Sequence, residues 1–240
     1  MQGQNQQQAY DRGITIFSPD GRLYQVEYAR EAVKRGTASI GVRTPEGVVL
    51  VVDKRTRSPL LEGSSVEKLH KVDDHVGAAS AGHVADARQL IDFARQQSQV
   101  EHVRYDEPIG VRTLTKNVTD HIQQYTQVGG ARPFGVALLI AGVSDGEPRL
   151  FETDPSGTSN EWKAVAIGSD RADIQDYLEA EYEADLSIDD GVKLALRALQ
   201  EGREDALEGE GVGVAVVDAD TGTYRELGTD ETADYIADLE

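Results

Sequence analysis

Hydrophobic positions recur along this chain with two different periods, which predict strands in some segments and helices in others. Alternating or continuously apolar runs typical of strands occupy 37–42, 48–52, 75–80, 134–143, 149–153, 162–167, 212–217 and 223–227. Helical spacing of apolar residues marks 23–35, 84–94, 111–125, 174–182, 188–199 and 229–239. Because the strands come mostly as hairpins and the helices in pairs, the pattern favours helices packed on antiparallel sheets over alternating βαβ units.

The stretch 10–36 contains a turn followed by a helix. Ser18-Pro19-Asp20-Gly21 is typical of a turn, since proline fixes φ at the second position and glycine tolerates the last. Four apolar residues then recur at helical spacing: Leu23, Val26, Ala29 and Val33. With Gly36 as the residue that ends it, this pattern predicts an N-terminal helix over 22–35.

Length and composition indicate one globular domain over 1–240. No repeat or change of composition marks a boundary, and 39% hydrophobic residues are enough for a substantial core. The Gln- and Asn-rich segment 1–13 is too polar to pack by itself, so we expect it to be flexible. No apolar run approaches the roughly 18 residues of a membrane span, and the start of the chain has no signal-peptide pattern. A cytoplasmic protein without a membrane association is expected.

The charge balance is strongly acidic, with 43 Asp and Glu against 24 Lys and Arg and a net charge of −19. Binding of nucleic acid is therefore not expected, because it needs clustered basic residues. Acidic residues spread along the whole chain favour adaptation to high salt over an ordinary acidic protein. With no cysteine, no paired histidine spacing and no Walker sequence, neither a metal nor another cofactor is expected.

The residue identities within 10–36 go beyond what a turn and a helix require. The strings YDR, F-S-P-D-G-R-L-x-Q-V-E-Y-A and E-A-V-K-x-G follow one another there. Together they resemble the N-terminal signature of proteasome α-subunits of the archaeal type, and the resemblance extends to about Glu201. It implies an α+β fold, a four-layer α-β-β-α sandwich of the N-terminal-nucleophile hydrolase type, with the extra N-terminal helix across one open end.

The same resemblance implies a function and a set of partners. Proteasome α-subunits are non-catalytic members of seven-membered rings in the 20S core particle, where they admit unfolded protein substrates to the β-subunits and bind a regulatory AAA-type ATPase. Ubiquitin-independent or small-modifier-linked proteolysis is the corresponding process. The matching gate residues are Tyr10, Asp11, Arg12, Pro19 and Tyr28. Lys68 matches the lysine that receives the C-terminal carboxylate of the ATPase, and Val128, Gly129, Gly130 and Arg132 match the loop of the axial pore. Two of these residues also have a plainer interpretation without a functional role: Tyr28 as a residue packed in the core, and Lys68 as a solvated surface lysine.

Two other functions remain open at this stage. Gly36-Thr37 resembles the processing site of catalytic β-subunits, and Asp53, Lys68 and Ser169 fall near positions where those subunits hold an acidic residue, a lysine and a serine. Against a threonine protease proenzyme, the residues before Thr37 form the α-signature, and the region from Arg203 lacks the Arg-Asp-x-x-Ser-Gly string of the catalytic relatives. An α-like homo-oligomer that acts as a scaffold or chaperone without β-subunits is the third possibility.

Overall fold

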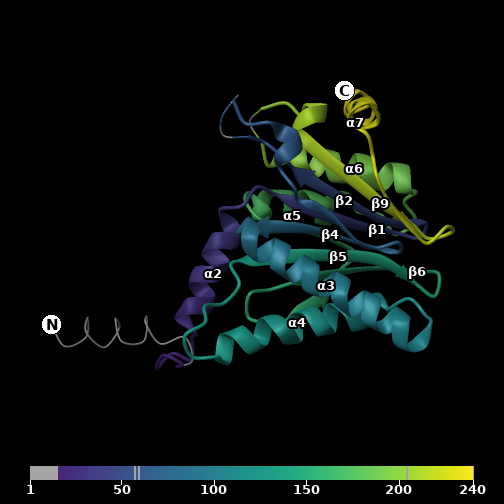
Figure 1. Ribbon diagram of the computed structural model, residues 1–240. Coiled ribbons are helices and arrows are strands. Elements are labelled where there is room, and N and C mark those ends of the chain that lie inside the picture. Colours follow the sequence, from purple (N-terminus) through teal and green to yellow (C-terminus); the bar gives the residue numbers. More distant parts are fainter. Residues whose placement is uncertain (1–15, 57, 59, 204, 240) are drawn as a thin grey trace.

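The computed structural model describes residues 16–239 except 57, 59 and 204, and these residues build two stacked antiparallel sheets (Figure 1). The strands of the first sheet lie in the order β10 (Thr223–Glu226), β9 (Val212–Asp218), β2 (Gly47–Asp53), β1 (Ser39–Thr44) and β8 (Ala164–Ile167). Those of the second lie in the order β3 (Leu69–Asp73), β4 (Val76–Gly82), β5 (Val136–Ser144), β6 (Glu147–Thr153) and β7 (Ser159–Glu161). The expected antiparallel hairpins are thus confirmed.

Helices cover the outer face of each sheet, and side chains fill the space between the sheets. The helices are α2 (Tyr24–Lys34), α3 (Val84–Tyr105), α4 (Val111–Gln127), α5 (Arg171–Glu181), α6 (Ile188–Glu201) and α7 (Thr229–Ala237), with 3-10 turns η1 (Gly63–Ser65) and η2 (Gly209–Gly211). Helices α5 and α6 share one apolar cluster with the first sheet, and α3 and α4 share another with the second. A third cluster, which includes Leu50, Leu139 and Leu150, joins the two sheets. The architecture is the expected α-β-β-α sandwich, in which each fully buried aliphatic side chain contributes about 1.5–3 kcal/mol.

Helix α2 lies along one end of the sandwich, at the left of Figure 1. It starts at Tyr24, later than the pattern over 22–35 suggested, because Leu23 has an extended backbone. Val26 and Ala29 are buried on its inner face, and the partly buried Val33 packs against the cluster between the sheets. The helix is also fixed by a bidentate ion pair, in which Arg30 donates to both carboxylate oxygens of Asp154 at 2.9 Å.

Two elements differ from the sequence pattern. The strand expected over 162–167 is present as β8, which pairs with β1 in the first sheet, but it is preceded by β7, a short strand that the pattern did not indicate and that pairs with β6 in the second sheet. The chain therefore crosses between the sheets at residues 162–163, and a local apolar pattern carries no signal for such a crossing. Helix α3 continues to Tyr105, well past the apolar stripe that ends at Ala94. Its last turns are mostly exposed, so they have no apolar stripe from which the sequence pattern could predict them.

Candidate functional site

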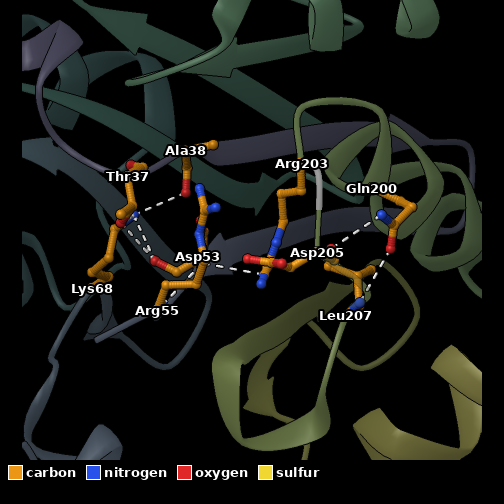
Figure 2. A network of polar contacts seen from close by, with 9 residues as sticks. All are labelled: Thr37, Ala38, Asp53, Arg55, Lys68, Gln200, Arg203, Asp205 and Leu207. Carbon is orange, nitrogen blue, oxygen red and sulfur yellow. Dashed lines mark hydrogen bonds and ion pairs between the residues drawn. The ribbon is translucent and has the colours of Figure 1, made fainter. Parts of the chain in front are cut away.

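A buried polar network lies where α2 is followed by β1, and Figure 2 shows its members. Thr37 stands just before β1, Asp53 is the last residue of β2, and Lys68 immediately precedes β3. The first two lie at ends of the neighbouring strands β1 and β2 in the interior of the first sheet, whereas Lys68 adjoins β3 at the edge of the second, so the network joins the two sheets. The structure therefore brings together three residues that the resemblance to β-subunits had grouped.

The ammonium of Lys68 is the centre of this network. Its Nζ lies 2.7 Å from the Thr37 carbonyl oxygen, 2.8 Å from the Thr37 hydroxyl, 2.8 Å from the Ala38 carbonyl oxygen and 3.1 Å from the Asp53 carbonyl oxygen. Only 7% of the residue is exposed. The interpretation of Lys68 as a solvated surface lysine is therefore wrong for the folded chain, because the side chain points inward onto main-chain oxygens.

The carboxylate of Asp53 is held by arginines rather than by Lys68. Arg55 donates from its main-chain N–H at 2.9 Å and from Nε at 2.6 Å, while Nη1 of Arg203 lies 3.4 Å from Oδ1. Asp53 is fully buried, and the Arg203 side chain is 6% exposed. Since a buried carboxylate without a partner is costly, these two arginines compensate its charge.

Burial lowers the pKa of Lys68 to about 7, because the charged form loses its hydration. The charge of Asp53 opposes this shift, whereas Arg55 and Lys54 add to it. Near neutral pH the amine is consequently close to the midpoint of its titration. A neutral amine beside a hydroxyl is able to accept a proton from it.

The main chain around Thr37 restricts that chemistry. A threonine nucleophile of this class uses its own free amine as the base. Here Thr37 follows Gly36 within the chain, the Gly36 carbonyl accepts a hydrogen bond from the Ser169 N–H at 2.7 Å, and the Thr37 hydroxyl donates to the Asp53 carbonyl at 2.7 Å. The folded chain therefore places Lys68 beside the Thr37 hydroxyl, but the main-chain nitrogen of Thr37 is in a peptide bond and is not the free amine that a threonine nucleophile requires.

The expected gate residues are partly within the described chain. Tyr10, Asp11 and Arg12, like the whole segment 1–13, lie outside the described residues. The expected turn is present: the Gly21 N–H donates to the Ser18 carbonyl at 2.9 Å, with Pro19 exposed at its second position.

Tyr28 lies on the outer side of α2. It is 50% exposed, so simple packing into the core does not account for it.

The expected pore loop, residues 128–132, connects α4 to β5 and is largely exposed. Val128 is 54% exposed, and Gly130 has a left-handed φ of 87°. At the end of the loop, the guanidinium of Arg132 forms a bidentate pair with Asp86 of α3, with distances of 2.6 and 2.7 Å. The structure does not place this loop in the Lys68 network, so the sequence-predicted residues form two separate sites.

Three residues of these sites were not singled out from the sequence. Arg55 follows Asp53 closely enough that the pair could have been anticipated, but Arg203 is 150 residues away from it. Asp86 and Arg132 are 46 residues apart. Partners so far apart in the sequence meet only in the folded structure, and a charged residue in the sequence does not indicate which residue will pair with it.

Comparison with known proteins agrees with this architecture. Residues 33–217 match the family described as "Proteasome subunit", and residues 10–32 match the N-terminal signature of A-type proteasome subunits. The chain is 88% identical over 240 residues to "Proteasome subunit alpha" of Halobacterium salinarum, covering 100% of this chain and 95% of that protein. It is 70% identical to "Proteasome subunit alpha 1" of Haloarcula marismortui, over 100% of this chain and 92% of the relative. It is 58% identical to "Proteasome subunit alpha 2" of Haloferax volcanii, over 98% and 96% respectively.

The chain therefore belongs to the proteasome subunit family. The N-terminal signature and these relatives define it further as an α-subunit, of the kind found in halophilic archaea. The interpretation of its acidic composition as an adaptation to high salt agrees with that origin.

The described part of the chain offers neither a metal site nor a membrane-spanning helix. Among these residues no group of three or more His, Cys, Asp or Glu is arranged to hold a metal ion. In the same part of the molecule, no helix is both long enough and apolar enough to cross a membrane.

Proposed function

We propose that this chain is a non-catalytic member of the seven-membered α-ring of a 20S proteasome core particle, acting in the cytoplasm. In this role it controls the access of unfolded proteins to the β-subunits, which carry out the proteolysis. The observation that carries the proposal is the helix in front of Thr37. Helix α2 is anchored by buried Val26 and Ala29 and by the Arg30–Asp154 pair, so the residues before Thr37 are an integral part of the fold.

Exposed apolar side chains support assembly with other subunits. The large hydrophobic residues that stay exposed in the described chain include Phe17, Leu60, Leu61, Val103 and Tyr105. Leu60 is 93% exposed and Val103 84% exposed, although the surface around them belongs to a very acidic protein. In this proposal these side chains lie on surfaces that other subunits cover.

Lys68 is the residue through which a regulatory ATPase acts in this proposal. A C-terminal carboxylate of the ATPase would replace one of the neutral oxygens around Nζ, and an ammonium–carboxylate bond, in which both partners are charged, is stronger than the ammonium–carbonyl bond it replaces. Because Lys68 holds the carbonyls of Thr37 and Ala38, binding there would act on the chain directly after α2. The Pro19 turn precedes α2 and Tyr28 lies on it, so in this proposal a displacement of α2 reaches both, and binding of the partner favours the open gate by its differential affinity.

The experiment uses the chain assembled with β-subunits, and it compares short-peptide hydrolysis with degradation of an unfolded protein. Deletion of 2–12 should raise degradation of the unfolded protein without any ATPase. Lys68→Ala should leave basal peptide hydrolysis unchanged and abolish stimulation by a C-terminal peptide of the ATPase. Lys71→Ala is the matched control, since this lysine lies three residues on, and its side chain is 52% exposed. Normal stimulation of Lys68→Ala would show that the docking assignment is wrong.

A threonine protease proenzyme is the second candidate, and the 2.8 Å contact between Lys68 Nζ and the Thr37 hydroxyl favours it. It requires cleavage between Gly36 and Thr37. The intact mass of the purified chain decides between the two functions: a species that begins at Thr37 supports the protease, and an uncut chain that co-purifies with a β-subunit supports the α-ring. An uncut homo-oligomer that never associates with a β-subunit would instead support a scaffold or chaperone.

A further inference from the structure

The pore loop, residues 128–132, has little support of its own. Its one internal main-chain hydrogen bond among those observed runs from the Ala131 N–H to the Val128 carbonyl and is long, at 3.3 Å. Gly129 and Gly130 are exposed, and no atom beyond their chain neighbours would lie within 4 Å of a Cβ added at either position. Two adjacent glycines in open space leave the backbone many conformations, so a fixed loop needs an external anchor.

That anchor is a carboxylate on a different element. Asp86 lies in the first turn of α3, where the helix dipole favours a negative charge. Its two oxygens accept hydrogen bonds from the Arg132 guanidinium, and Oδ2 also accepts the Gly135 N–H at 2.8 Å. The Asp86 side chain is 7% exposed whereas Arg132 is 59% exposed, so the buried partner is the fixed one.

Electrostatics make this contact persistent. Burial by itself would raise the pKa of Asp86, but hydrogen bonds from Arg132 and Gly135, together with the charge of Arg132, lower it instead. Because this pKa lies below its ordinary value of 3.8, the carboxylate is ionised at neutral pH. A bidentate arginine–carboxylate pair also fixes the orientation of the guanidinium plane, which a single hydrogen bond does not.

We propose that Asp86 is the positioning residue of the pore loop: it sets how far residues 128–131 extend and thereby the width of the opening they line. This inference rests on the proposed function, in which the loop lines the axial pore. It adds a residue outside the loop, on α3, whose link to the opening is the ion pair with Arg132 and the bond to Gly135.

The surrounding main chain makes the inference testable without unfolding the protein. The base of the loop is also held by the His83 N–H, which donates to the Gly135 carbonyl at 2.8 Å, and β5 begins at Val136. Asp86→Asn keeps the shape of the side chain and one acceptor for the Gly135 N–H, but it cannot accept both guanidinium N–H groups. Arg132→Gln is the second variant, and it changes an exposed side chain.

Because the chain has no cysteine, a single spin label reports on the loop alone. Val128→Cys carries the label in the assembled complex, and Val103→Cys on α3 is the matched control at another exposed valine. In Asp86→Asn and in Arg132→Gln the slow-motion component of the spectrum should be lost at 128 and retained at 103. A label at 128 that stays equally immobile in both variants overturns the inference.

A second measurement separates the loop anchor from the role of the loop in the pore. In chains that also lack 2–12, the Asp86→Asn complex should degrade an unfolded protein faster, while its kcat and KM for a short peptide stay unchanged. If the label at 128 becomes mobile but protein degradation does not change, Asp86 positions the loop and the assignment of the loop to the pore is wrong. If the label at 128 becomes mobile and degradation rises, both the positioning role of Asp86 and the assignment of the loop to the pore are supported.

Discussion

Lys68 is a buried cation whose nearest neighbours are mainly neutral oxygens. The closest carboxylate, Asp53, directs its oxygens to Arg55 and Arg203, so its charge is already compensated. Lys68 itself contacts Asp53 only at its main-chain carbonyl, although the molecule as a whole has a net charge of −19. Burial destabilises the protonated lysine, and the charges of Arg55 and Lys54 add to this effect, so its pKa falls to about 7 from the ordinary 10.5.

A pH dependence of stability follows from this shift. Between pH 7 and 10.5 the unfolded chain keeps the proton on Lys68 and the folded chain releases it, so the free energy of unfolding rises with pH across this window. The slope from this group reaches about 1.4 kcal/mol per pH unit. Below 7 both states are protonated and the full penalty of burial remains. In denaturant titrations, the free energy of unfolding of Lys68→Met relative to that of the natural chain should therefore fall as the pH rises through the window.

The control for this experiment is Lys71→Met, which removes an exposed lysine and should leave the rise intact. An equal stability difference between Lys68→Met and the natural chain at both ends of the window would contradict the shifted pKa.

Individual residues also show what the sequence was able to predict. Thr37, Asp53 and Lys68 were grouped correctly because a resemblance supplied their spacing. Arg203 was noted only for a missing string, yet it turns toward the same carboxylate. Its partner is decided by the packing of α6 and the following segment against β2, which no local pattern encodes. The loop 128–132 was singled out from its string, and its role in a pore stays a prediction, whereas the ion pair of Arg132 with Asp86 on α3 was not anticipated.

At the scale of elements, the periodicity of apolar residues correctly predicted those helices and strands that bury one face against the core. The helix α6 has a complete apolar stripe and the capping Ser187, whose hydroxyl accepts the Asp190 N–H at 3.1 Å. Periodicity failed where tertiary pairing decides, as in β7, a short polar strand that pairs with β6. Conversely, the exposed last turns of α3 form a helix although they have almost nothing to bury.

Close backbone contacts between elements depend on glycine at the end of β4. Gly82 has a φ of 119°, and a Cβ there would lie 2.3 Å from the Gly135 carbonyl oxygen at the base of the pore loop. Gly82→Ala is therefore expected to lower the free energy of unfolding by more than about 1 kcal/mol, through strain at positive φ and through the clash. Gly129→Ala is the control, because its Cβ would meet no atom within 4 Å, and it should change stability by less than about 0.5 kcal/mol. Equal effects in thermal unfolding would contradict the close approach.

At the scale of the whole molecule, the net charge of −19 acts on assembly. In the proposed ring, neighbouring subunits would repel one another in dilute buffer. The Debye length is about 10 Å at about 0.1 M salt and falls to about 3 Å at about 1 M. We predict rings at molar salt and dissociation at low salt, measured by sedimentation across a salt series. Circular dichroism on the same samples separates dissociation from unfolding. Rings that persist unchanged at all salt concentrations would contradict both this prediction and the importance of screening.

The position of Lys68 also bears on the order in which the chain folds. Its acceptors are 15, 30 and 31 residues away and belong to the other sheet, so its network forms only after β1, β2 and β3 have come together. Closing the intervening chain costs entropy before any bond repays it, and this cost is smaller here than for the pairing of β2 with β9, which are far more distant in the sequence. The junction that would receive a regulatory partner therefore depends on an early part of the chain, and a chain in which the two sheets have not yet packed together lacks it.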